Sequence, residues 1–257
     1  MFVSIQHKGK SYKADFSKPI DISIPLKAGK NNVNAWHAEP VKIEPVRNGD
    51  WVGEVKSGGS VNFRNISFNP HGNGTHTECV GHISKEDYSV NDSLKTFFFI
   101  AEVISILPEE LSNGDFVITE THIKNCLSEG IPLGEEKRPE ALIIRTVSNP
   151  ASKKEMQYSN TNPPYLTPEA MKLIVSLRVE HLLIDLPSID KENDGGLTAC
   201  HHIFWNYPEK PDTGKTITEL IYVPNDVLDG TYLLNLQIAS FVNDAVPSKP
   251  VIYRLVL

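Results

Sequence analysis

Several absences narrow the functions open to this sequence. Lysine and arginine number 25 against 32 aspartates and glutamates, so the formal net charge is −7. An acidic chain without a basic cluster is a poor partner for nucleic acid or an anionic membrane surface. The chain also lacks a long apolar run, and its polar first residues contain no apolar signal segment, so we expect neither a transmembrane helix nor a signal peptide. These absences favour a cytoplasmic protein with no nucleic-acid and no membrane partner.

Cysteine is also scarce. The 257 residues include 3 cysteines, Cys79, Cys126 and Cys200. An odd number at wide spacing implies no disulfide framework, and reduced thiols fit the cytoplasm. The apolar fraction of 40% and the charged fraction of 22% are typical of globular proteins. A chain of this length buries a sizeable core without cross-links, so we expect one domain over residues 1–257.

Apolar, β-branched segments dominate the hydrophobic pattern. Residues 97–107 and 141–145 are typical of buried strands, and residues 181–185 form a third segment of this kind. Strands and helices do not alternate regularly along the chain. The sequence therefore predicts an α/β fold of the α+β kind, a single domain around a mixed, barrel-like β-sheet with a few flanking helices.

Two segments carry helix signals. Thr167-Pro168-Glu169 is typical of a helix start, because a hydroxyl caps the first turn, proline fits its geometry and an acid favours its positive end. A second short helix is predicted over Glu120–Ser128, with Thr121 as its cap. Between these two helices, residues 146–166 form a long internal loop, and such loops are often functional.

Metal-binding residue types are concentrated in residues 71–82, which contain His71, His76, Glu78 and His82. His76, Glu78 and His82 share parity, so they point to one face if the segment is extended. His71 has the opposite parity, and a β-bulge at the glycines that follow it would turn it onto the same face. Mixed histidine and carboxylate ligands suit zinc, manganese or iron better than calcium or magnesium. A histidine-rich surface loop with an ordinary turn fits the spacing about equally well.

A second group lies in residues 185–219 and contains Asp185, Asp190, His201, His202 and Glu219. Glu219 shares its strand face with Ile217 and Ile221, and a carboxylate on an apolar face is costly unless it is paired or binds a metal. An edge position with solvent access is the alternative. The adjacent His201 and His202 cannot both face one site from a regular strand. Asp185, Asp190 and His202 could orient ligand imidazoles, although ordinary core hydrogen bonding is the favoured role for these three.

The segment GTHTECVGH resembles the signature His-x-Gly-Thr-His-x-Asp-x-Pro-x-His of the cyclase family whose best-known members are bacterial kynurenine formamidases. Gly74-Thr75-His76 and His82 match this pattern. Glu78 takes the aspartate position, Val80 takes the proline position, and His71 is displaced by one residue. Further segments resemble the family in the same order along the chain, at residues 14–20, 141–146, 166–170, 184–190, 199–202 and 217–220.

This resemblance implies a single α/β domain around a mixed, barrel-like sheet, assembled as a homodimer or a larger homo-oligomer. It also implies two divalent metal ions, zinc or manganese. His71, His76 and Glu78 would hold one ion, His201 and Glu219 would complete the pair, and His82 would transfer protons. Two departures stand out: glutamate for aspartate adds one methylene at Glu78, and the spacing from His201 to Glu219 is longer than the family's.

The function expected on this basis is hydrolysis of an amide C–N bond in a small molecule, an N-formyl or a cyclic amide, by a metal-activated water. His82 would act as general base and then as general acid. Two alternatives remain open: a non-catalytic or single-metal relative that acts as a binding protein, and a metal-assisted lyase or isomerase. Bound metal separates the enzyme from the binding protein. The substrate of kynurenine formamidases is not transferred, because residues 31–60 and 146–166 show no clear match to them.

Overall fold

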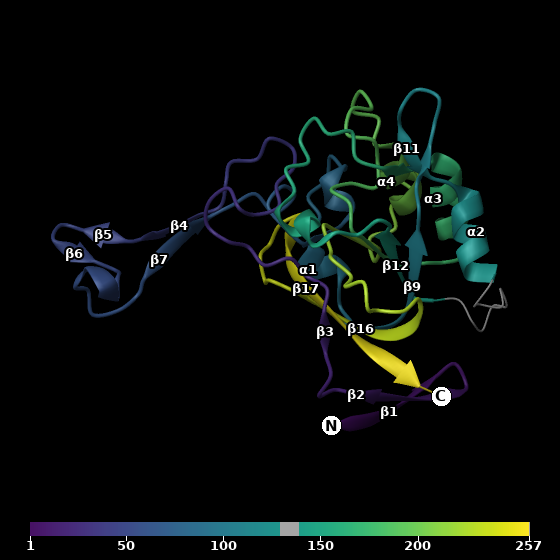
Figure 1. Ribbon diagram of the computed structural model, residues 1–257, viewed down its shortest axis with the longest axis horizontal. Coiled ribbons are helices and arrows are strands. Elements are labelled where there is room, and N and C mark those ends of the chain that lie inside the picture. The colour runs from purple at the N-terminus through teal and green to yellow at the C-terminus, as the bar shows by residue number, and fades with distance from the viewer. Residues whose placement is uncertain (129–138, 257) are drawn as a thin grey trace.

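The computed structural model describes residues 1–128 and 139–256, and its centre is a closed barrel (Figure 1). Seven strands follow one another in the order β17-β16-β9-β12-β14-β15-β8, and β8 pairs with β17 to close the ring. They are β8 (His76–Glu78), β9 (Phe98–Ile106), β12 (Ala141–Thr146), β14 (His181–Ile184), β15 (Thr216–Glu219), β16 (Gly230–Ile238) and β17 (Ala245–Val256). The pairs among β9, β12, β14 and β15 are parallel, and the other pairs of the ring are antiparallel. The predicted mixed, barrel-like sheet is confirmed.

The parallel strands are buried on both faces. Every residue of β12 and β14 is buried. Leu142 and Ile144 pack against helical residues such as Phe204, whereas Ile143 packs with Leu234 in a second apolar cluster formed by the barrel strands. Because successive side chains of a strand alternate between faces, a strand buried on both sides is apolar throughout. This explains the continuous apolar runs in the sequence.

Helices cover one side of the barrel. They are α2 (Glu120–Ser128), α3 (Pro168–Ser176) and α4 (Ala199–Trp205), while α1 (Val90–Ser93) is a single turn elsewhere. The Thr167 hydroxyl caps α3 as predicted, because it accepts a hydrogen bond from the Ala170 N–H at 3.2 Å. The cap predicted for α2 is wrong: the helix begins at Glu120, so Thr121 already lies in its first turn. In the described ranges, no helix combines the length and apolar character needed to cross a membrane.

Smaller strands extend the barrel. β1 (Phe2–His7) and β2 (Lys10–Asp15) form a hairpin beside the end of β17, and β3 (Ile20–Asp21) also pairs with β17. A separate three-stranded sheet contains β10 (Glu109–Glu110), β11 (Phe116–Ile118) and β13 (Tyr165–Leu166). The described residues also form the short 3-10 helices η1 (Val55–Ser57), η2 (Val80–His82) and η4 (Ala151–Glu155).

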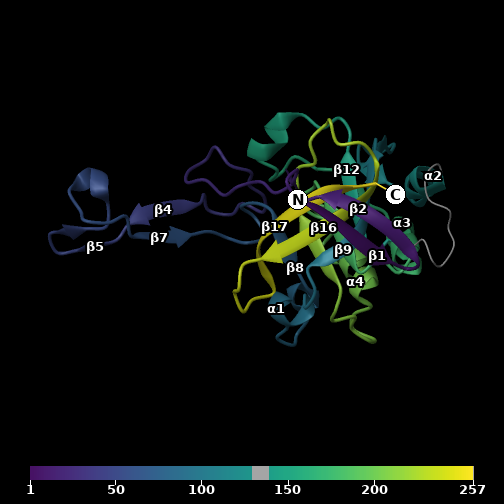
Figure 2. The ribbon, with the colours of Figure 1, turned by 90° about the horizontal axis from the view of Figure 1, so that it is seen from below.

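A long arm projects from the barrel (Figures 1 and 2). It is a two-stranded ribbon of β4 (Lys42–Pro45) and β7 (Arg64–Ser67), with a tip that contains β5 (Arg47–Asn48), β6 (Trp51–Val52) and η1. Residues 61–69 alternate in the sequence as if one face were buried, but every residue of β7 is exposed. The reason is that the ribbon stands away from the barrel and has no core behind it.

Candidate metal centre

The structure brings all the predicted site residues together where β8 and β15 pair. β8 carries His76 and Glu78, and Glu219 of β15 is the register partner of His76. His201 comes from α4, His82 from η2, and His71 from the turn before β8. His76, Glu78, His201 and Glu219 are buried. Segments more than a hundred residues apart in the sequence thus form one cluster.

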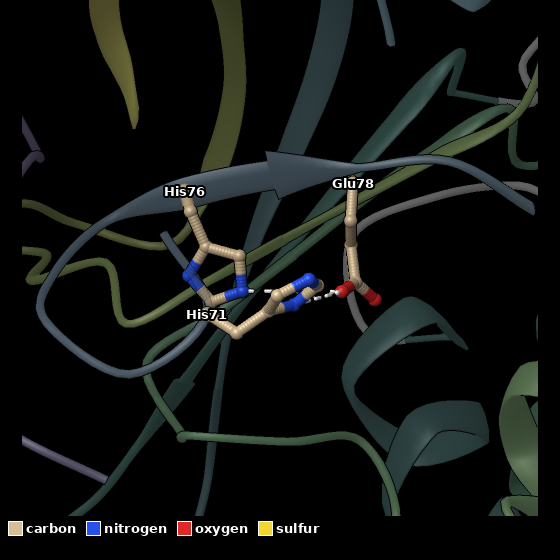
Figure 3. A group of neighbouring side chains, drawn as sticks. All are labelled: His71, His76 and Glu78. Atoms are coloured by element: carbon tan, nitrogen blue, oxygen red, sulfur yellow. Dashed lines mark ion pairs between the residues drawn. The ribbon is translucent and has the colours of Figure 1, made fainter. Parts of the chain in front are cut away.

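The side chains of β8 follow the predicted parity, but His82 reaches the cluster by a different route. His76 and Glu78 point to the same side of the strand (Figure 3). The strand then ends at Glu78, and Val80–His82 form a 3-10 turn. The assumption of an extended chain up to His82 is therefore wrong. The turn folds the chain back, so that His82 Nδ1 lies 3.9 Å from Glu78 Oε2.

His71 lies in a turn, not at the predicted β-bulge. The Asn73 side chain accepts a hydrogen bond from the Asn69 N–H at 2.7 Å, and the Asn69 side chain accepts one from the Gly72 N–H at 3.1 Å. A Cβ on Gly72 would lie 2.5 Å from Ala38 Cβ, so this glycine is required for packing. The turn places His71 Nδ1 3.1 Å from Glu78 Oε2 (Figure 3).

Glu78 is the centre of the cluster. Its carboxylate lies 3.1 Å from His71 Nδ1, 3.1 Å from His201 Nε2 and 3.9 Å from His76 Nε2. Burial opposes ionisation of this carboxyl, but the electrostatic interaction with His82 and the hydrogen bonds from His201 and His71 outweigh it and hold the pKa of Glu78 well below its usual range. Glu78 is therefore ionised, as a carboxylate must be to bind a cation.

Asp190 fixes the orientation of His201. Its Oδ2 lies 2.6 Å from His201 Nδ1, and its carboxylate also accepts hydrogen bonds from the N–H groups of Cys200 and His201. The other ring nitrogen, Nε2, then faces Glu78 and lies 3.8 Å from Glu219 Oε1. Burial lowers the pKa of His201, but Asp190 and Glu78 raise it to about 10 in the cluster without a cation.

The residues around His201 show which way His202 points and which of the three proposed orienting groups contacts a ligand. His201 and His202 lie on the helix α4, not on a strand, and point in different directions. His202 Nδ1 lies 2.9 Å from the Tyr207 carbonyl oxygen, which is outside the cluster. Asp185 accepts hydrogen bonds from Thr146 and Lys153 instead. Of the three residues considered as orienting groups, only Asp190 contacts a predicted ligand.

Asp244 is a member of the cluster that sequence reasoning missed. It lies in the loop between β16 and β17, with Oδ2 2.9 Å from His71 Nε2 and 3.7 Å from His82 Nδ1. Hydrogen bonds from His71 and His82 lower the pKa of Asp244. The only signal in the sequence is an acid in a polar turn, FVNDA, which many surface loops share.

The donor set fits a divalent cation. His76 Nδ1 lies 3.0 Å from the Gly74 carbonyl oxygen, which can only accept, so Nδ1 carries the proton and Nε2 keeps its lone pair. His76 Nε2 is buried and has no hydrogen-bond partner among the described residues, and it faces the buried Glu78 Oε2 at 3.9 Å. Buried polar atoms rarely lack partners, and imidazole nitrogens with carboxylate oxygens are ligands of zinc and manganese. The candidate ligand atoms of His71, His76 and Glu78 all lie within 4.8 Å of one another.

A cavity of about 350 Å³ opens beside the cluster. His71, His82, His201 and Glu219 line one side of it, and Trp36, from the segment before the arm, lies on its wall. Volumes of this order hold a small organic molecule. Trp205 packs against the His201 ring with 5.5 Å between ring centroids, and Trp51 lies on the arm. Of the three tryptophans, Trp36 is therefore the one that reaches the cavity.

The comparison with family models decides the relationship of this chain to known proteins. The family described as Putative cyclase matches residues 20–191. The chain belongs to this family. The matched segment contains β8 and Asp190, whereas His201, Glu219 and Asp244 lie beyond it. No curated protein matches the sequence.

Several solved structures share the fold over nearly the whole chain. A potential metal-dependent hydrolase with cyclase activity is 15% identical, has a TM-score of 0.62, and covers 92% of this chain and 97% of its own. A predicted metal-dependent hydrolase from Bacillus stearothermophilus is 16% identical, with a TM-score of 0.60 and coverage of 92% and 98%. Isatin hydrolase A from Labrenzia aggregata, bound to benzyl benzoate, is 17% identical, with a TM-score of 0.65 and coverage of 92% and 93%. At these identities the property that the comparison shows to be shared is the fold.

Proposed function

We propose that this cyclase-family protein hydrolyses the amide C–N bond of a small molecule, with an N-formyl or a cyclic amide as its substrate. The observation that carries the proposal is the buried His76 Nε2, which has no hydrogen-bond partner among the described residues and faces Glu78 Oε2 at 3.9 Å, beside a cavity of about 350 Å³. The fold shared with isatin hydrolase, whose name describes hydrolysis of isatin, supports a hydrolase.

We propose two divalent ions, zinc or manganese, with His71, His76, Glu78, His201 and Glu219 as the residues that would hold them. A cation held there would polarise the amide carbonyl and lower the pKa of water, so that a nucleophile would be available near neutral pH. The two glutamates would offset part of the added positive charge. The Ile189 N–H donates to Glu219 Oε1 at 3.0 Å, and this bond holds that carboxylate toward the cluster.

His82 is the proposed proton-transfer residue. Its side chain is 32% exposed, whereas the side chains of His76 and Glu78 are fully buried, so it lies at the cavity side of the cluster. Its Nδ1 faces the carboxylates of Asp244 and Glu78 at 3.7 and 3.9 Å. Nε2 is then the nitrogen that takes a proton from the attacking water and returns it to the leaving nitrogen.

Metal analysis of the purified protein, followed by a screen of N-formyl and cyclic amides, tests this proposal. We expect about two equivalents of zinc or manganese and one hydrolysed amide class. His76→Ala and Glu219→Ala should lose metal and activity, His82→Ala should keep the metal and lose rate, and His7→Ala on β1 is the matched control. A folded protein without metal would make it a binding protein, and a product formed without uptake of water would make it a lyase or isomerase.

We also propose that the protein acts in the cytoplasm as a homodimer. Its three cysteines form no disulfide, which suits a reducing compartment. A two-stranded ribbon is marginally stable in water, and Phe63 and Ile66 on the arm are 58% and 60% exposed. A second copy that packs against the arm would bury these side chains. Light scattering should give twice the chain mass, and Phe63→Asp with Ile66→Asp should give monomers, whereas Val242→Asp, on an exposed loop of the barrel, should not.

A further inference from the structure

A second cavity has a volume of about 530 Å³ and shares no wall residue with the cavity beside the metal cluster. It opens at the carboxyl ends of β9, β12 and β14, where Leu107, Thr146 and Leu186 contribute to its wall. The rest of the wall comes from the β10–β11 hairpin and from residues 147–164. The carboxyl ends of parallel strands are the usual place for ligand sites in α/β sheets. The hydrolysis proposed for the cluster at β8 and β15 does not involve this cavity.

The charged group in the cavity wall is already neutralised. Lys153 Nζ donates to Asp185 Oδ2 at 2.8 Å and to Thr146 Oγ1 at 2.6 Å, and it lies 3.3 Å from the Thr146 carbonyl oxygen. These contacts use all three donors of the ammonium group. Asp185 is fully buried and takes further hydrogen bonds from Thr146. Lys153 therefore offers no donor to an anion, and the cavity suits an uncharged molecule.

Tyr158 supplies a hydroxyl group to the wall of the same cavity. The residue is 5% exposed and lines the cavity. Burial, together with the charge of Asp185, raises the pKa of Tyr158, so the hydroxyl keeps its proton at physiological pH. A protonated hydroxyl in a cavity wall can donate a hydrogen bond to an acceptor atom of a ligand.

Exposed apolar side chains surround the mouth of the cavity. Leu107 is 68% exposed, Phe116 is 40% exposed and Met156 is 39% exposed. Apolar side chains that gather at a concave surface are typical of a binding site for an apolar molecule. Pro150, Pro163 and Pro164 also belong to the wall, and their fixed rings keep it preformed.

We propose that this cavity is a second ligand site, separate from the metal cluster, for a neutral, mostly apolar aromatic molecule whose carbonyl oxygen accepts a hydrogen bond from Tyr158. The two sites are neighbours. Tyr158 and Pro163 also border a small space that reaches Trp36 and Glu192, which line the metal-side cavity. One layer of side chains thus separates a molecule in the second site from the metal site.

The three methionines provide the readout for a test. Met156 lies at the cavity, Met171 is in the core and Met1 is at the N-terminus, so methyl NMR of the full chain reports on the site and carries its own controls. We expect acetophenone to shift the Met156 signal saturably and to leave Met1 in place. Tyr158→Phe should weaken acetophenone binding about three- to tenfold, the effect of one lost hydrogen bond, without changing the binding of ethylbenzene. Tyr12→Phe on β2 is the matched control.

Two results would overturn the proposal. One is a Met156 signal that does not move with acetophenone or ethylbenzene, which would leave the cavity without a ligand. The other is equal acetophenone affinity in the wild type and in Tyr158→Phe, which would remove the role of the hydroxyl. The same titration on His76→Ala tests independence: an unchanged Met156 response supports a second site, and a lost response makes the cavity part of the metal site and contradicts the proposal.

Discussion

Asp244 Oδ2 lies 2.9 Å from Nε2 of His71, although 173 positions separate the two residues in the chain. Because His71 Nδ1 faces Glu78, the imidazole lies between two carboxylates. The ring stands 4.3 Å from that of His82, measured between centroids, and Asp244 also faces His82. Asp244 therefore holds both a proposed ligand and the proposed proton-transfer residue from outside the segment of residues 71–82.

Replacing this carboxylate tests its role. We expect Asp244→Asn to fold normally and to lose about 10- to 100-fold in kcat/KM or in metal affinity, the usual effect of removing a partner of a ligating histidine. Asp226→Asn, at an exposed position outside the cluster, is the matched control. Amide hydrolysis and chelator competition measured on both variants decide the question. Equal values for Asp244→Asn and the control would show that Asp244 is an ordinary loop residue.

Asp190 should affect metal binding through His201 only. Asp190→Asn can keep an oxygen for the N–H of Cys200, but an NH2 group in place of Oδ2 no longer accepts from His201 and no longer fixes the charge and orientation of the imidazole. We expect weaker metal binding, by about 10- to 100-fold, with a nearly unchanged melting temperature. Competition against a chelator of known affinity measures the effect, with Asp92→Asn on α1 as the control. An unchanged metal affinity would count against His201 as a ligand.

The turn that carries His71 depends on the absence of a side chain at Gly72. In Gly72→Ala the new Cβ would meet Ala38 Cβ at 2.5 Å and the Ala35 carbonyl oxygen at 2.8 Å, so the turn has to move. We expect a loss of about 1–3 kcal/mol in the free energy of unfolding, together with weaker metal binding. Gly214→Ala is the matched control, because a Cβ there meets no atom within 4 Å. If denaturant unfolding gives the same value for both variants, the packing argument is wrong.

Glu102 should make stability depend on pH away from the metal centre. Burial and the neighbouring Asp229 raise the pKa of Glu102 from 4.5 to about 7, and the residue is 7% exposed. A raised carboxyl pKa favours the protonated form in the folded state. Its contribution to stability is therefore complete below about pH 4.5 and is lost as the pH rises through about 7.

Glu102→Gln removes this titration and keeps an oxygen that accepts from Thr231. We expect the variant to match the wild type near pH 5 and to exceed it near pH 8 by about 1–3 kcal/mol in the free energy of unfolding. Urea unfolding at the two pH values measures the difference, with Glu44→Gln on the exposed side of the arm as the control. A wild type that is equally stable at both values would contradict the raised pKa.

Local patterns in the sequence were sufficient to predict several features of the fold and of the site. The apolar runs of β9, β12 and β14 identify buried strands, because a strand covered on both faces has no polar side. Thr167 identifies the start of α3, since a cap satisfies backbone donors within one turn. The parity of His76 and Glu78 on a common face follows from the alternation of a strand. Each of these relationships spans only a few residues.

The sequence by itself thus determined the strand faces, the helix cap and the residue types that could bind a cation, because these depend on residue type and on backbone geometry over a few residues. Only the tertiary structure decided how the residues of the cluster meet. The 3-10 turn brings His82 back to Glu78, and α4 places His201 in the cluster. The pairing of β8 with β15 brings Glu219 to His76, and its pairing with β17 brings Asp244 to His71. These distances depend on barrel closure between segments more than a hundred residues apart. No local pattern encodes such a closure, so Asp244 carried no recognisable signal until the barrel was closed.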